Sequence, residues 1–471
     1  MKRVLVAGGG IAGLACAYCL LRLREKRGLD FELTLLEASD RLGGKIKTDR
    51  SAGFVVEAGP DSFLTIKPEA VALARELGIG DRVLPTAPGS RDVYVYVRGR
   101  LRRMPEGLLL MAPSKPLPFL LSDIMSWRGK LRMGLELLVP RGGPDPGRGG
   151  SAADESLAEF TRRRLGQEAL DTIVDPLMAG IYAADSETLS LASTFPQFVE
   201  MEKRYGSVIR GMRTSPRLAK GPKAEALSAF ASFAGGLEEL VDALRNVLGP
   251  VVRTGVRARR AVREGTRWRV ETGGESLLAD ALVLALPSPD AAAALEEADA
   301  ALAGVLREIA NVTTATLTLG FKPSDVPDLP KGYGFVVAKG AGLSINAATF
   351  TSHKFAQRGY GMAVIRCFLG GAGKEEWAEA SEERMLEGAL ADLRRTIGIE
   401  ARPQVVRAFR WEKANPQYTV GHGARLARIE QRLAGLPNLW LTGGSYYGVG
   451  IPDCIRSGRM AAEKACKALS S

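Results

Sequence analysis

The chain has 471 residues, 46% of them apolar, and its 64 Lys and Arg residues outnumber 53 Asp and Glu residues, giving a formal net charge of +11. This composition is that of an ordinary globular protein, and the length indicates two or three domains with ample core. Five scattered cysteines argue against a disulfide framework, and two distant histidines leave no ready metal site or Ser-His-Asp triad, so we expect a cofactor to carry the chemistry.

The chain shows no sign of targeting or membrane insertion. Only Met1, Lys2 and Arg3 precede the first apolar run, and no apolar run reaches about 18 residues. We therefore expect a cytoplasmic protein with no transmembrane helix. The basic charge suits an anionic membrane surface or an acidic small molecule, whereas no known aromatic-basic module indicates a nucleic-acid partner.

The N-terminal segment carries a dinucleotide-binding pattern. An apolar run over 4–7 predicts a buried parallel strand, a G-x-G-x-x-G turn follows, and residues 14–21 predict a buried helix. Glycines permit the tight turn and the close approach of a pyrophosphate to the helix N-terminus. A second strand over 31–36 ends at an acid placed to accept ribose hydroxyls. A glycine turn that serves packing alone would not account for this acid. The predicted binding residues are Gly8, Gly10, Ile11, Ala12, Gly13, Glu37 and Ala38.

A second motif follows at once and distinguishes FAD from NAD. Residues 41–48 resemble the R-x-G-G-R-x-x-T element of amine-oxidase-like flavoproteins, which implies that Arg41, Gly44 and Lys45 bind FAD. Lys45 stands where that element usually has Arg, so we expect one cationic contact to be altered.

The dinucleotide fold is predicted to be assembled from three separated segments. Residues 281–287 form another buried strand, 439–441 form a strand into a glycine-rich turn, and 453–469 form a helix. A second glycine-rich turn before a helix can present further backbone amides to the cofactor, although it can also be a simple connection. We expect an α/β protein with a Rossmann-type FAD-binding domain, an α+β substrate-binding domain and a mainly helical insertion. Their predicted bounds are 1–67, 233–287 and 408–471 for the first, 68–91 and 288–407 for the second, and 92–232 for the third.

One segment of the predicted helical domain has the composition of a membrane-surface element. Residues 104–121 contain two apolar runs, with Leu109, Leu110, Phe119 and Leu120 among them. They are flanked by basic residues, chiefly Arg102, Arg103 and Lys115. Apolar side chains beside Lys and Arg are typical of peripheral contact with a bilayer. A buried, proline-punctuated core segment is the alternative.

Along essentially its whole length the chain resembles the FAD-dependent, oxygen-dependent protoporphyrinogen oxidases. The resemblance rests on residues 57–62, 175–185, 202–208, 235–236 and 448–458. It implies oxidation of protoporphyrinogen IX to protoporphyrin IX in haem biosynthesis, a six-electron reaction with hydrogen peroxide as by-product. Porphyrinogen, oxygen and a peripheral membrane surface are the implied partners, and a homodimer is compatible with the sequence. No side chain is an obvious general base.

Site residues are carried over from the family by motif. The implied flavin-binding residues beyond those above are Gly59, Pro60, Asp61, Ser62, Val256, Trp411, Gly448, Val449, Gly450 and Ile451. The implied substrate-binding residues are Arg91 for a propionate, Gly180 for a backbone contact, and Val336, Ile345 and Phe368 for the macrocycle. Plain core positions are the alternative for the last three.

Three rival functions stay open. A coproporphyrinogen III oxidase of the same fold would handle four propionates instead of two. A flavin amine oxidase or carotenoid desaturase is the second rival, because Tyr446 and Tyr447 could form part of an aromatic cage. A non-catalytic flavin-binding protein is the third.

Overall fold

The computed structural model describes residues 1–470 except 52–53, 90, 110, 114, 143–153 and 215–227, and it leaves out the side chains of 109, 112 and 181. The chain folds into two compact units. Unit 1 contains Met1–Pro85, Leu227–Ala310 and Gly423–Ser471, and unit 2 contains Thr86–Ala226 and Asn311–His422. Each unit is therefore built from segments far apart in the sequence.

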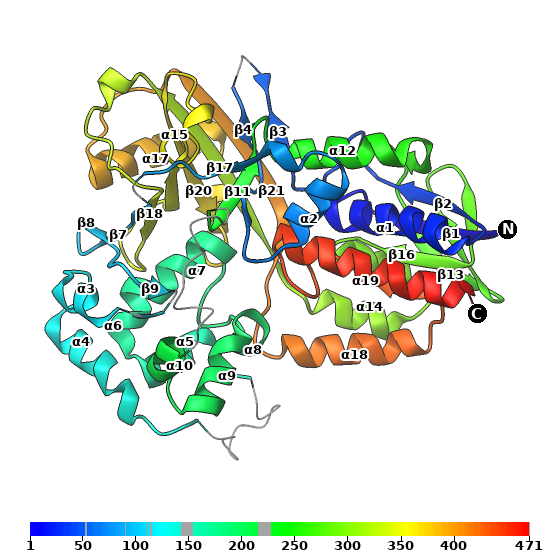
Figure 1. The fold of residues 1–471 in the computed structure, drawn as a ribbon, viewed down its shortest axis with the longest axis horizontal. Coiled ribbons are helices and arrows are strands. Elements are labelled where there is room, and N and C mark those ends of the chain that lie inside the picture. Colours follow the sequence, from blue (N-terminus) through cyan, green and yellow to red (C-terminus); the bar gives the residue numbers. More distant parts are fainter. Residues whose placement is uncertain are drawn as a thin grey trace. The chain divides into compact units, whose positions relative to one another are not determined.

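Unit 1 is organised around a five-stranded, all-parallel sheet (Figure 1). The strands lie in the order β12 (Val252–Arg253), β2 (Phe31–Leu36), β1 (Lys2–Ala7), β16 (Ala281–Leu284) and β22 (Leu439–Leu441). Apolar side chains fill both faces of these strands, as expected for a parallel sheet covered by helices on both sides. This arrangement confirms the predicted Rossmann-type fold, and β2 has the bounds that the sequence predicted.

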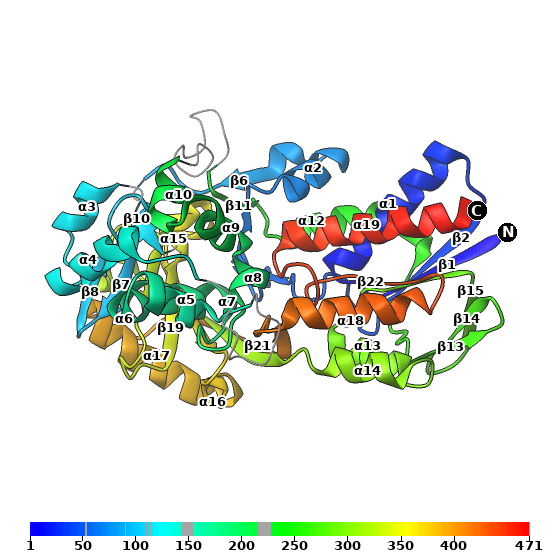
Figure 2. The same cartoon turned by 90° about the horizontal axis from the view of Figure 1, so that it is seen from below.

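Two layers of helices enclose this sheet, as Figure 2 shows. Apolar residues of one face pack against α1 (Ile11–Arg27), α2 (Glu69–Glu76), α12 (Glu238–Leu248) and α19 (Ile451–Ser470). The other face packs against α13 (Ser288–Leu295), α14 (Ala300–Arg307) and α18 (His422–Ala434), together with the small sheet of β13 (Arg260–Glu264), β14 (Arg267–Glu271) and β15 (Ser276–Ala279).

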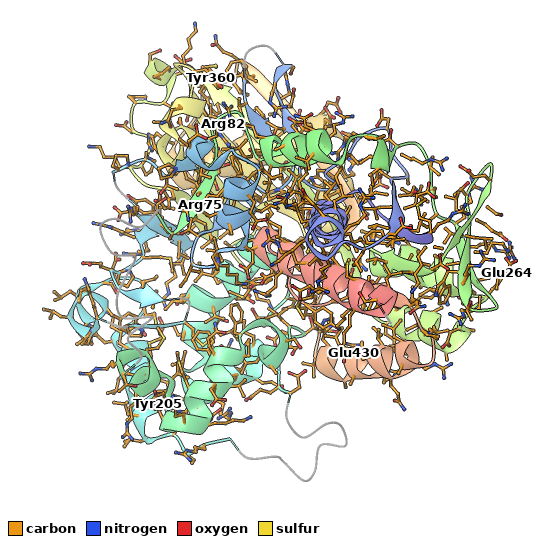
Figure 3. All side chains as sticks on the ribbon, turned by 45° about the vertical axis from the view of Figure 1, so that its right-hand side comes forward. Arg75, Arg82, Tyr205, Glu264, Tyr360 and Glu430 are labelled. Atoms are coloured by element: carbon orange, nitrogen blue, oxygen red, sulfur yellow. The ribbon has the colours of Figure 1, made fainter. Side chains whose placement is uncertain are left out.

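Short strands and ion pairs complete unit 1. They are β3 (Thr48–Asp49) paired with β4 (Val56–Glu57), and β11 (Phe230–Phe233) paired with β5 (Phe63–Leu64) and β6 (Val83–Pro85). Arg82, labelled in Figure 3, pairs with Glu239 of α12 just before β6 begins. The pair fastens this edge of unit 1 to the helix layer.

Unit 2 is built on a seven-stranded mixed sheet. Its order is β21 (Val405–Pro416), β17 (Asn311–Phe321), β20 (Ala363–Gly370), β19 (Ile345–Phe350), β18 (Gly334–Val337), β7 (Val93–Val97) and β8 (Arg100–Arg103). One face is covered by α17 (Glu382–Ile397) and α16 (Glu375–Glu379), whose residues share a core with alternate strand residues such as Leu317 and Ile365. Since side chains alternate along a strand, the residues between these point to the opposite face.

Strands β7 and β8 depart from the sequence-based expectation of a helical stretch. Residues 93–97 alternate Val and Tyr, a pattern that favours a strand, and Arg98 and Gly99 both adopt positive φ in the turn to β8. β7 pairs in parallel with β18, about 240 residues further along the chain. The start of the region predicted as helical therefore belongs to the main sheet of unit 2.

The rest of that region is mainly helical, as predicted. Its elements are β9 (Leu108–Leu109), β10 (Ala112–Pro113), α3 (Pro116–Leu121), α4 (Trp127–Gly134), η3 (Leu135–Leu138), α5 (Leu157–Arg164), α6 (Gln167–Ala169), η4 (Leu170–Val174), α7 (Asp175–Tyr182), α8 (Leu191–Thr194), α9 (Pro196–Tyr205) and α10 (Val208–Thr214). The three-domain division predicted from the sequence remains a prediction.

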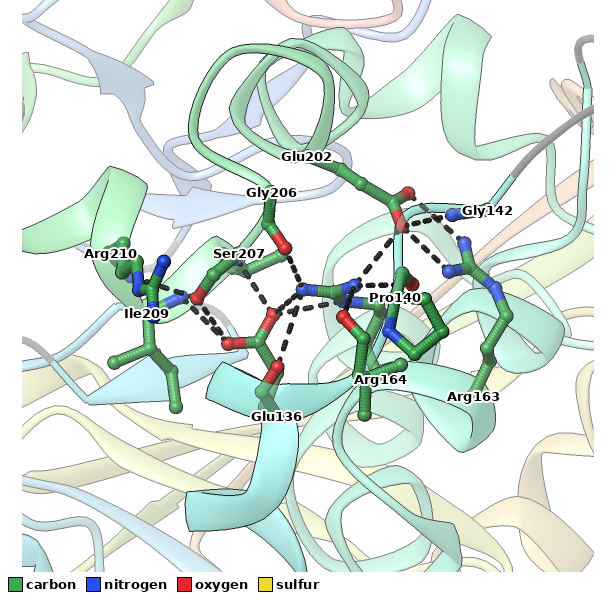
Figure 4. Close-up of polar contacts among 12 residues, drawn as sticks. Glu136, Pro140, Gly142, Arg163, Arg164, Glu202, Gly206, Ser207, Ile209 and Arg210 are labelled. Carbon is green, nitrogen blue, oxygen red and sulfur yellow. Dashed lines mark hydrogen bonds and ion pairs between the residues drawn. The ribbon is translucent and has the colours of Figure 1, made fainter.

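A buried ion network ties these helices together (Figure 4). The Arg164 side chain is fully buried and donates to Glu136 of η3 at 2.9 Å and to Glu202 of α9 at 3.2 Å. Glu136 in turn accepts the backbone N–H of Val208 at 2.8 Å, at the start of α10. Burial pushes the pKa of Glu202 upward, but hydrogen bonds from Arg163 hold it below its usual range. The network therefore fixes η3, α5, α9 and α10 against one another.

The segment predicted to contact membranes is not one amphipathic helix. Phe119 and Met111 are buried, while Leu117 and Leu121 of α3 are exposed. Leu110 and the side chain of Leu109 lie outside the described residues. Exposed apolar side chains continue into α4 and η3, and we call this set the apolar patch: Leu117, Leu120, Leu121, Trp127, Leu131, Leu135, Leu137 and Leu138.

The three cations predicted to attract lipid are in ion pairs. Arg102 pairs with Asp123, Lys115 with Glu106, and Arg103 with Asp92. Each of these cations thus has an acidic partner in its own chain. In the part of the chain that the structure describes, no helix has the length and apolar content required to traverse a bilayer.

Candidate functional site

The turn between β1 and α1 needs glycine for two separate reasons. Gly8 has φ of +110°, and a Cβ there would lie 2.4 Å from the carbonyl oxygen of Ala285. A Cβ on Gly13 would lie 1.9 Å from the Gly8 oxygen, so the helix could not approach the strand. Gly10 is different, because a Cβ there would meet no atom within 4 Å. Packing therefore requires glycine at positions 8 and 13, whereas Gly10 borders open space at the helix N-terminus.

Glu37 is held beside this turn. Its carboxylate accepts the backbone N–H of Gly9 at 2.7 Å and that of Ser39 at 2.8 Å. The Glu37 carbonyl accepts the N–H of Val256 at 2.9 Å, so the structure brings Val256 to the predicted acid. Ala38, the next residue, is exposed. The acid is thus oriented by its own chain at the end of β2, close to where the turn begins.

The second motif forms a loop that lies on the first. The Arg41 guanidinium donates to the carbonyls of Leu42 and Ile46, at 3.1 and 3.2 Å. The Gly43 N–H donates to the Gly9 carbonyl at 2.9 Å, which brings residue 44 against Gly10. Arg41 therefore shapes the loop and does not extend from it as a free cation.

Lys45, which replaces the usual Arg of this motif, is half-buried in the same loop. Burial lowers the pKa of its ammonium group, while the nearby Cys454 of α19 acts to raise it. Burial also raises the pKa of the Cys454 thiol to about 11. A compact ammonium in this position offers fewer fixed donors than a guanidinium would.

The turn between β22 and α19 is a second glycine-rich approach to a helix N-terminus. Gly448 has φ of +123°, and a Cβ there would lie 2.6 Å from Cβ of Asp453. Asp453 is buried in the first turn of α19 and accepts from Lys67 at 2.6 Å. Deeper in α19, a Cβ on Gly458 would lie 2.2 Å from the Ala12 carbonyl oxygen, so the two helices touch through backbone. Residues 448–451 therefore lie close to the start of α1.

A buried acid links further motifs; the resemblance included it in residues 57–62, but no role was assigned to it. The Glu57 carboxylate accepts from Thr48 Oγ1 and from the Leu237 N–H, both at 2.8 Å. Gly236 has φ of +102°, and a Cβ there would collide with Thr48. This contact explains the glycine pair 235–236 and anchors residues 59–62, which come two positions after Glu57. Its signals in the sequence are the motif at 57–62 and its place at the end of a short apolar run.

The predicted flavin-binding residues thus fall into two groups. Those of the β1–α1 turn, the 41–46 loop, Val256 and the turn at 448–451 lie together in unit 1. Trp411 lies on β21 of unit 2, where it pairs with Thr314, and is not among them.

The group in unit 1 fits a dinucleotide cofactor. The N-terminus of α1 has no side-chain cap and no acid in its first turn, which leaves its N–H groups and positive dipole end for a phosphate. FAD would be held there by the turn at 8–13, with Glu37 as acceptor for ribose hydroxyls and the turn at 448–451 as a further source of backbone donors.

In unit 2, several predicted substrate residues lie on the sheet face opposite α17. Strand register places one row of residues across six strands, which we call the apolar row: Phe409, Thr316, Phe368, Ala347, Val336 and Val95. Phe368 is half-buried within it. Gly180 of α7 packs on this row, since a Cβ there would lie 3.1 Å from Val336 and 3.5 Å from Ala347. The structure therefore brings Gly180, Val336 and Phe368 to one surface.

Ile345 is not part of that surface. It is fully buried in the core under α17, beside Leu369 in the strand register. The register shifts between Ile345 and Ala347, and this irregularity turns Ile345 to the other face of the sheet. Arg91 is exposed and lies two residues before β7. These positions favour core packing for Ile345 and leave the assignment of Arg91 as a prediction.

The two tyrosines considered for an aromatic cage have other surroundings. Tyr446 is buried in the core of unit 1. The Tyr447 hydroxyl donates to Glu430 of α18 at 2.6 Å, and Glu430 is labelled in Figure 3. The rings lie 6.4 Å apart with planes tilted by 46°. Burial and the contact with Glu430 raise the pKa of Tyr447. The pair does not present two parallel faces to a ligand.

Comparison with known proteins identifies the family. The family model of flavin-containing amine oxidoreductases matches residues 11–466. The chain belongs to this family. The cofactor is a flavin, and the prediction of FAD is confirmed.

Relatives are similar over their full length. Coproporphyrinogen III oxidase of Bacillus subtilis is 34% identical, with 100% of this chain and 99% of that protein covered. Protoporphyrinogen oxidase of Bos taurus is 32% identical, with 98% of each covered. A crystal structure from an Exiguobacterium species, provisionally named a protoporphyrinogen oxidase, superimposes with a TM-score of 0.86 at 32% identity, covering 100% of this chain and 99% of that one.

A more distant structure shares the fold. Cyclohexylamine oxidase from Brevibacterium oxydans superimposes with a TM-score of 0.70 at 18% identity, with 100% of both chains covered. The predicted architecture is therefore shared well beyond the porphyrinogen oxidases.

Proposed function

We propose that this flavin oxidoreductase oxidises a porphyrinogen to a porphyrin in haem biosynthesis, with molecular oxygen as the final electron acceptor and coproporphyrinogen III as the preferred substrate. The observation that carries the proposal is the full-length similarity to coproporphyrinogen III oxidases, such as that of Bacillus subtilis at 34% identity. The sequence-based expectation named protoporphyrinogen IX, which becomes the second candidate.

The sheet face of unit 2 supports a flat apolar substrate. The apolar row runs across neighbouring strands and contains no titratable side chain. Such a surface can hold a macrocycle by burial and by contact with the Phe368 ring, and it excludes water from the reacting carbon. An amine substrate is less well served, because Tyr446 is buried in the core of unit 1.

The chemistry itself would belong to the cofactor. FAD, held by the turn at 8–13 and by Glu37, would supply the two-electron oxidation chemistry. Removal of six electrons from one porphyrinogen, with oxygen as the final acceptor, would give one porphyrin and three molecules of hydrogen peroxide. The chain's own part is to bind the porphyrinogen, to hold it in one orientation and to keep water away. No described residue of the apolar row is placed to act as a proton acceptor.

The second candidate, protoporphyrinogen IX, is favoured by the 32% identity to the bovine enzyme over 98% of both chains. The two substrates differ in carboxylate number, four against two. A basic surface beside the macrocycle would favour the more acidic one, and the net charge of +11 agrees with this preference.

Turnover of both porphyrinogens tests the proposal directly. The FAD-loaded protein is mixed with each substrate in air, porphyrin fluorescence gives kcat/KM, and peroxide is measured in parallel. We expect higher kcat/KM for coproporphyrinogen III and about three peroxides per porphyrin. Faster reaction with protoporphyrinogen IX would select the second candidate. Oxidation of neither, or of an amine alone, would reject porphyrinogen chemistry.

A further inference from the structure

Next to the apolar row, the same sheet face carries a second row of different character. It lies two residues further along each strand, about 7 Å away. Register places these residues in it, and we call them the basic row: Arg407, Thr318, Arg366, Thr349, Gly334 and Val93. The row contains two arginines and no acidic residue.

Arg366 is an unusual residue for this position. It interrupts the otherwise apolar strand Ala363–Gly370 and is only 2% exposed. Its guanidinium carbon lies 4.9 Å from the centre of the Phe368 ring, so the cation sits directly beside the apolar row. A cation at this place is suited to a ligand that carries negative charge at its rim.

Thr318 supplies an independent observation. It lies between Arg366 and Arg407 in the register, on the strand that separates theirs, and is 3% exposed. Its hydroxyl is buried and has no hydrogen-bond partner among the residues that the structure describes. A buried hydroxyl without a partner is uncommon and calls for an explanation, such as a group that is bound there. A carboxylate would accept from this hydroxyl and from the flanking guanidinium groups.

Arginines elsewhere on this sheet and on α17 contact the fold, and Arg407 also does so, since its Nη1 donates to the Val406 carbonyl at 2.9 Å. Arg410, on the same strand as Arg407, donates to the carbonyl of Ala378 at 2.6 Å and so fastens α16. Arg384, on α17, stacks on Trp377 at 5.1 Å. The combination of burial, an adjacent aromatic ring and an unpartnered hydroxyl distinguishes the basic row from these contacts.

We infer that Arg366, Thr318 and Arg407 form a carboxylate-binding subsite for a propionate side chain of the tetrapyrrole. The inference rests on the proposed function and deepens it, because it names the group that orients the macrocycle on the apolar row. Arg366 is the principal donor, Thr318 adds a neutral hydrogen bond, and the half-buried Arg407 contributes at the outer side. Arginine can bind a carboxylate through two parallel hydrogen bonds, which fixes orientation as well as affinity.

The test compares charged and neutral forms of one macrocycle. KM is measured for coproporphyrinogen III and for its tetramethyl ester, in the wild type and in Arg366→Gln, Arg407→Gln and Thr318→Val. We expect KM for the free acid to rise about tenfold or more in Arg366→Gln and about threefold in Thr318→Val. We expect KM for the ester to change less than twofold. Arg384→Gln and Thr396→Val, on α17, are the matched controls.

The melting temperature is a second readout, because a binding role and a structural role of Thr318 predict opposite changes in it. Removing a buried hydroxyl that has no partner leaves no broken hydrogen bond, so Thr318→Val should keep or raise the melting temperature while raising KM. A lower melting temperature with unchanged KM would make Thr318 a structural residue and overturn the inference. If Arg366→Gln does not fold, Thr318→Val and Arg407→Gln decide the matter. Equal KM changes for acid and ester would also overturn it.

Binding measured without turnover distinguishes a failure of the carboxylate-binding subsite from a failure of the proposed function. Coproporphyrin III and its ester are titrated against the protein by fluorescence quenching. If the wild type oxidises no porphyrinogen but binds the free acid about tenfold more tightly than Arg366→Gln does, the proposed function fails and the subsite stands. If the wild type oxidises porphyrinogens and the variants bind the free acid as tightly as the wild type, the subsite fails and the function stands.

Discussion

Two of the buried arginines of unit 2, Arg164 and Arg366, lie in different surroundings. Arg164 is enclosed by acids and carbonyls of its own chain, among them Glu136, Glu202 and the Gly206 carbonyl at 2.8 Å (Figure 4). Arg366 lies beside Phe368 in a row that holds a second arginine and no acid. Burial alone therefore does not tell which role the charge of an arginine has. Arg164 holds helices together, while the environment of Arg366 is suited to an acidic ligand.

The largest effect is expected at Arg164. Arg164→Met leaves Glu136 buried with its charge uncompensated, so the free energy of unfolding should fall by about 3–5 kcal/mol. Urea denaturation followed by circular dichroism measures it. The control is Arg162→Gln, whose exposed pair with Glu187 should contribute at most about 1 kcal/mol. A loss below that size for Arg164→Met would show that the two buried arginines do not differ as described.

The double variant sharpens the same point. Glu136→Gln combined with Arg164→Met removes both charges, so it should be more stable than Arg164→Met alone. No recovery would mean that packing, and not charge, holds η3 against α10.

Ile345 and Phe368 extend the comparison to apolar residues on the two faces of one sheet. Ile345→Ala should lower the free energy of unfolding by about 2–5 kcal/mol, because it opens a cavity under α17. Phe368→Ala should mainly raise KM or slow flavin reduction by substrate, since the ring is half-buried on the apolar row. Thermal melts and anaerobic stopped-flow bleaching are run on both. Normal bleaching with a lowered melting temperature in Phe368→Ala would place it with Ile345 in the core.

Glu37 allows the same distinction for an acid. Glu37→Ala should weaken FAD binding by roughly 1.5–3 kcal/mol, because a charged acceptor for ribose hydroxyls is lost. FAD titration of the apoprotein measures the affinity. Glu32→Ala is the control, since Glu32 lies on β2, the strand that precedes Glu37, with its side chain exposed beside Arg3. Unchanged affinity with reduced stability would mean that Glu37 serves only the turn whose N–H groups it accepts.

The smallest effect is expected at the apolar patch. On α3, Phe119 points into the core and Leu121 is 77% exposed, so one short helix contains both kinds of residue. Leu121→Ser and Leu138→Ser should each weaken sedimentation with anionic liposomes by about 1 kcal/mol, or roughly fivefold. Because the nearby cations are paired, salt should reduce binding only modestly. Failure of the wild type to sediment at any salt concentration would refute membrane contact.

How far the sequence could predict the molecule depends on the range of the interactions involved. The strands and glycines of the β1–α1 turn lie within about 35 neighbouring residues, and the sequence alone predicts them. The β7–β8 hairpin was not, because membership of the sheet depends on pairing with residues 334–337. The Arg164 network joins residues of four separate elements, and no local sequence pattern predicts it.

Substrate residues show a subtler limit. Alternation along β20 assigns Arg366 and Phe368 to one face, which a reader of the sequence could infer once the strand is known. On β19 the register irregularity after Ile345 reverses the alternation, so counting residues gives the wrong face. Arg366 was nevertheless visible as a lone charge in an apolar strand. Its place beside Thr318 and Arg407 becomes visible only from the register of the three strands.

The close packing of α1 on α19 has a consequence for synthesis on the ribosome. Arg27 ends α1 and Ile451 begins α19, so 424 positions of translation separate the two helices. At typical elongation rates of about 5–20 residues per second, synthesis of α19 begins roughly 20–85 s after that of α1 ends. Meanwhile the surface of α1 around Cys16 and Leu20, which is buried in the finished unit, stays uncovered. A nascent chain stalled before Ile451 should therefore bind chaperones that recognise exposed apolar surface, whereas the complete, released protein should not.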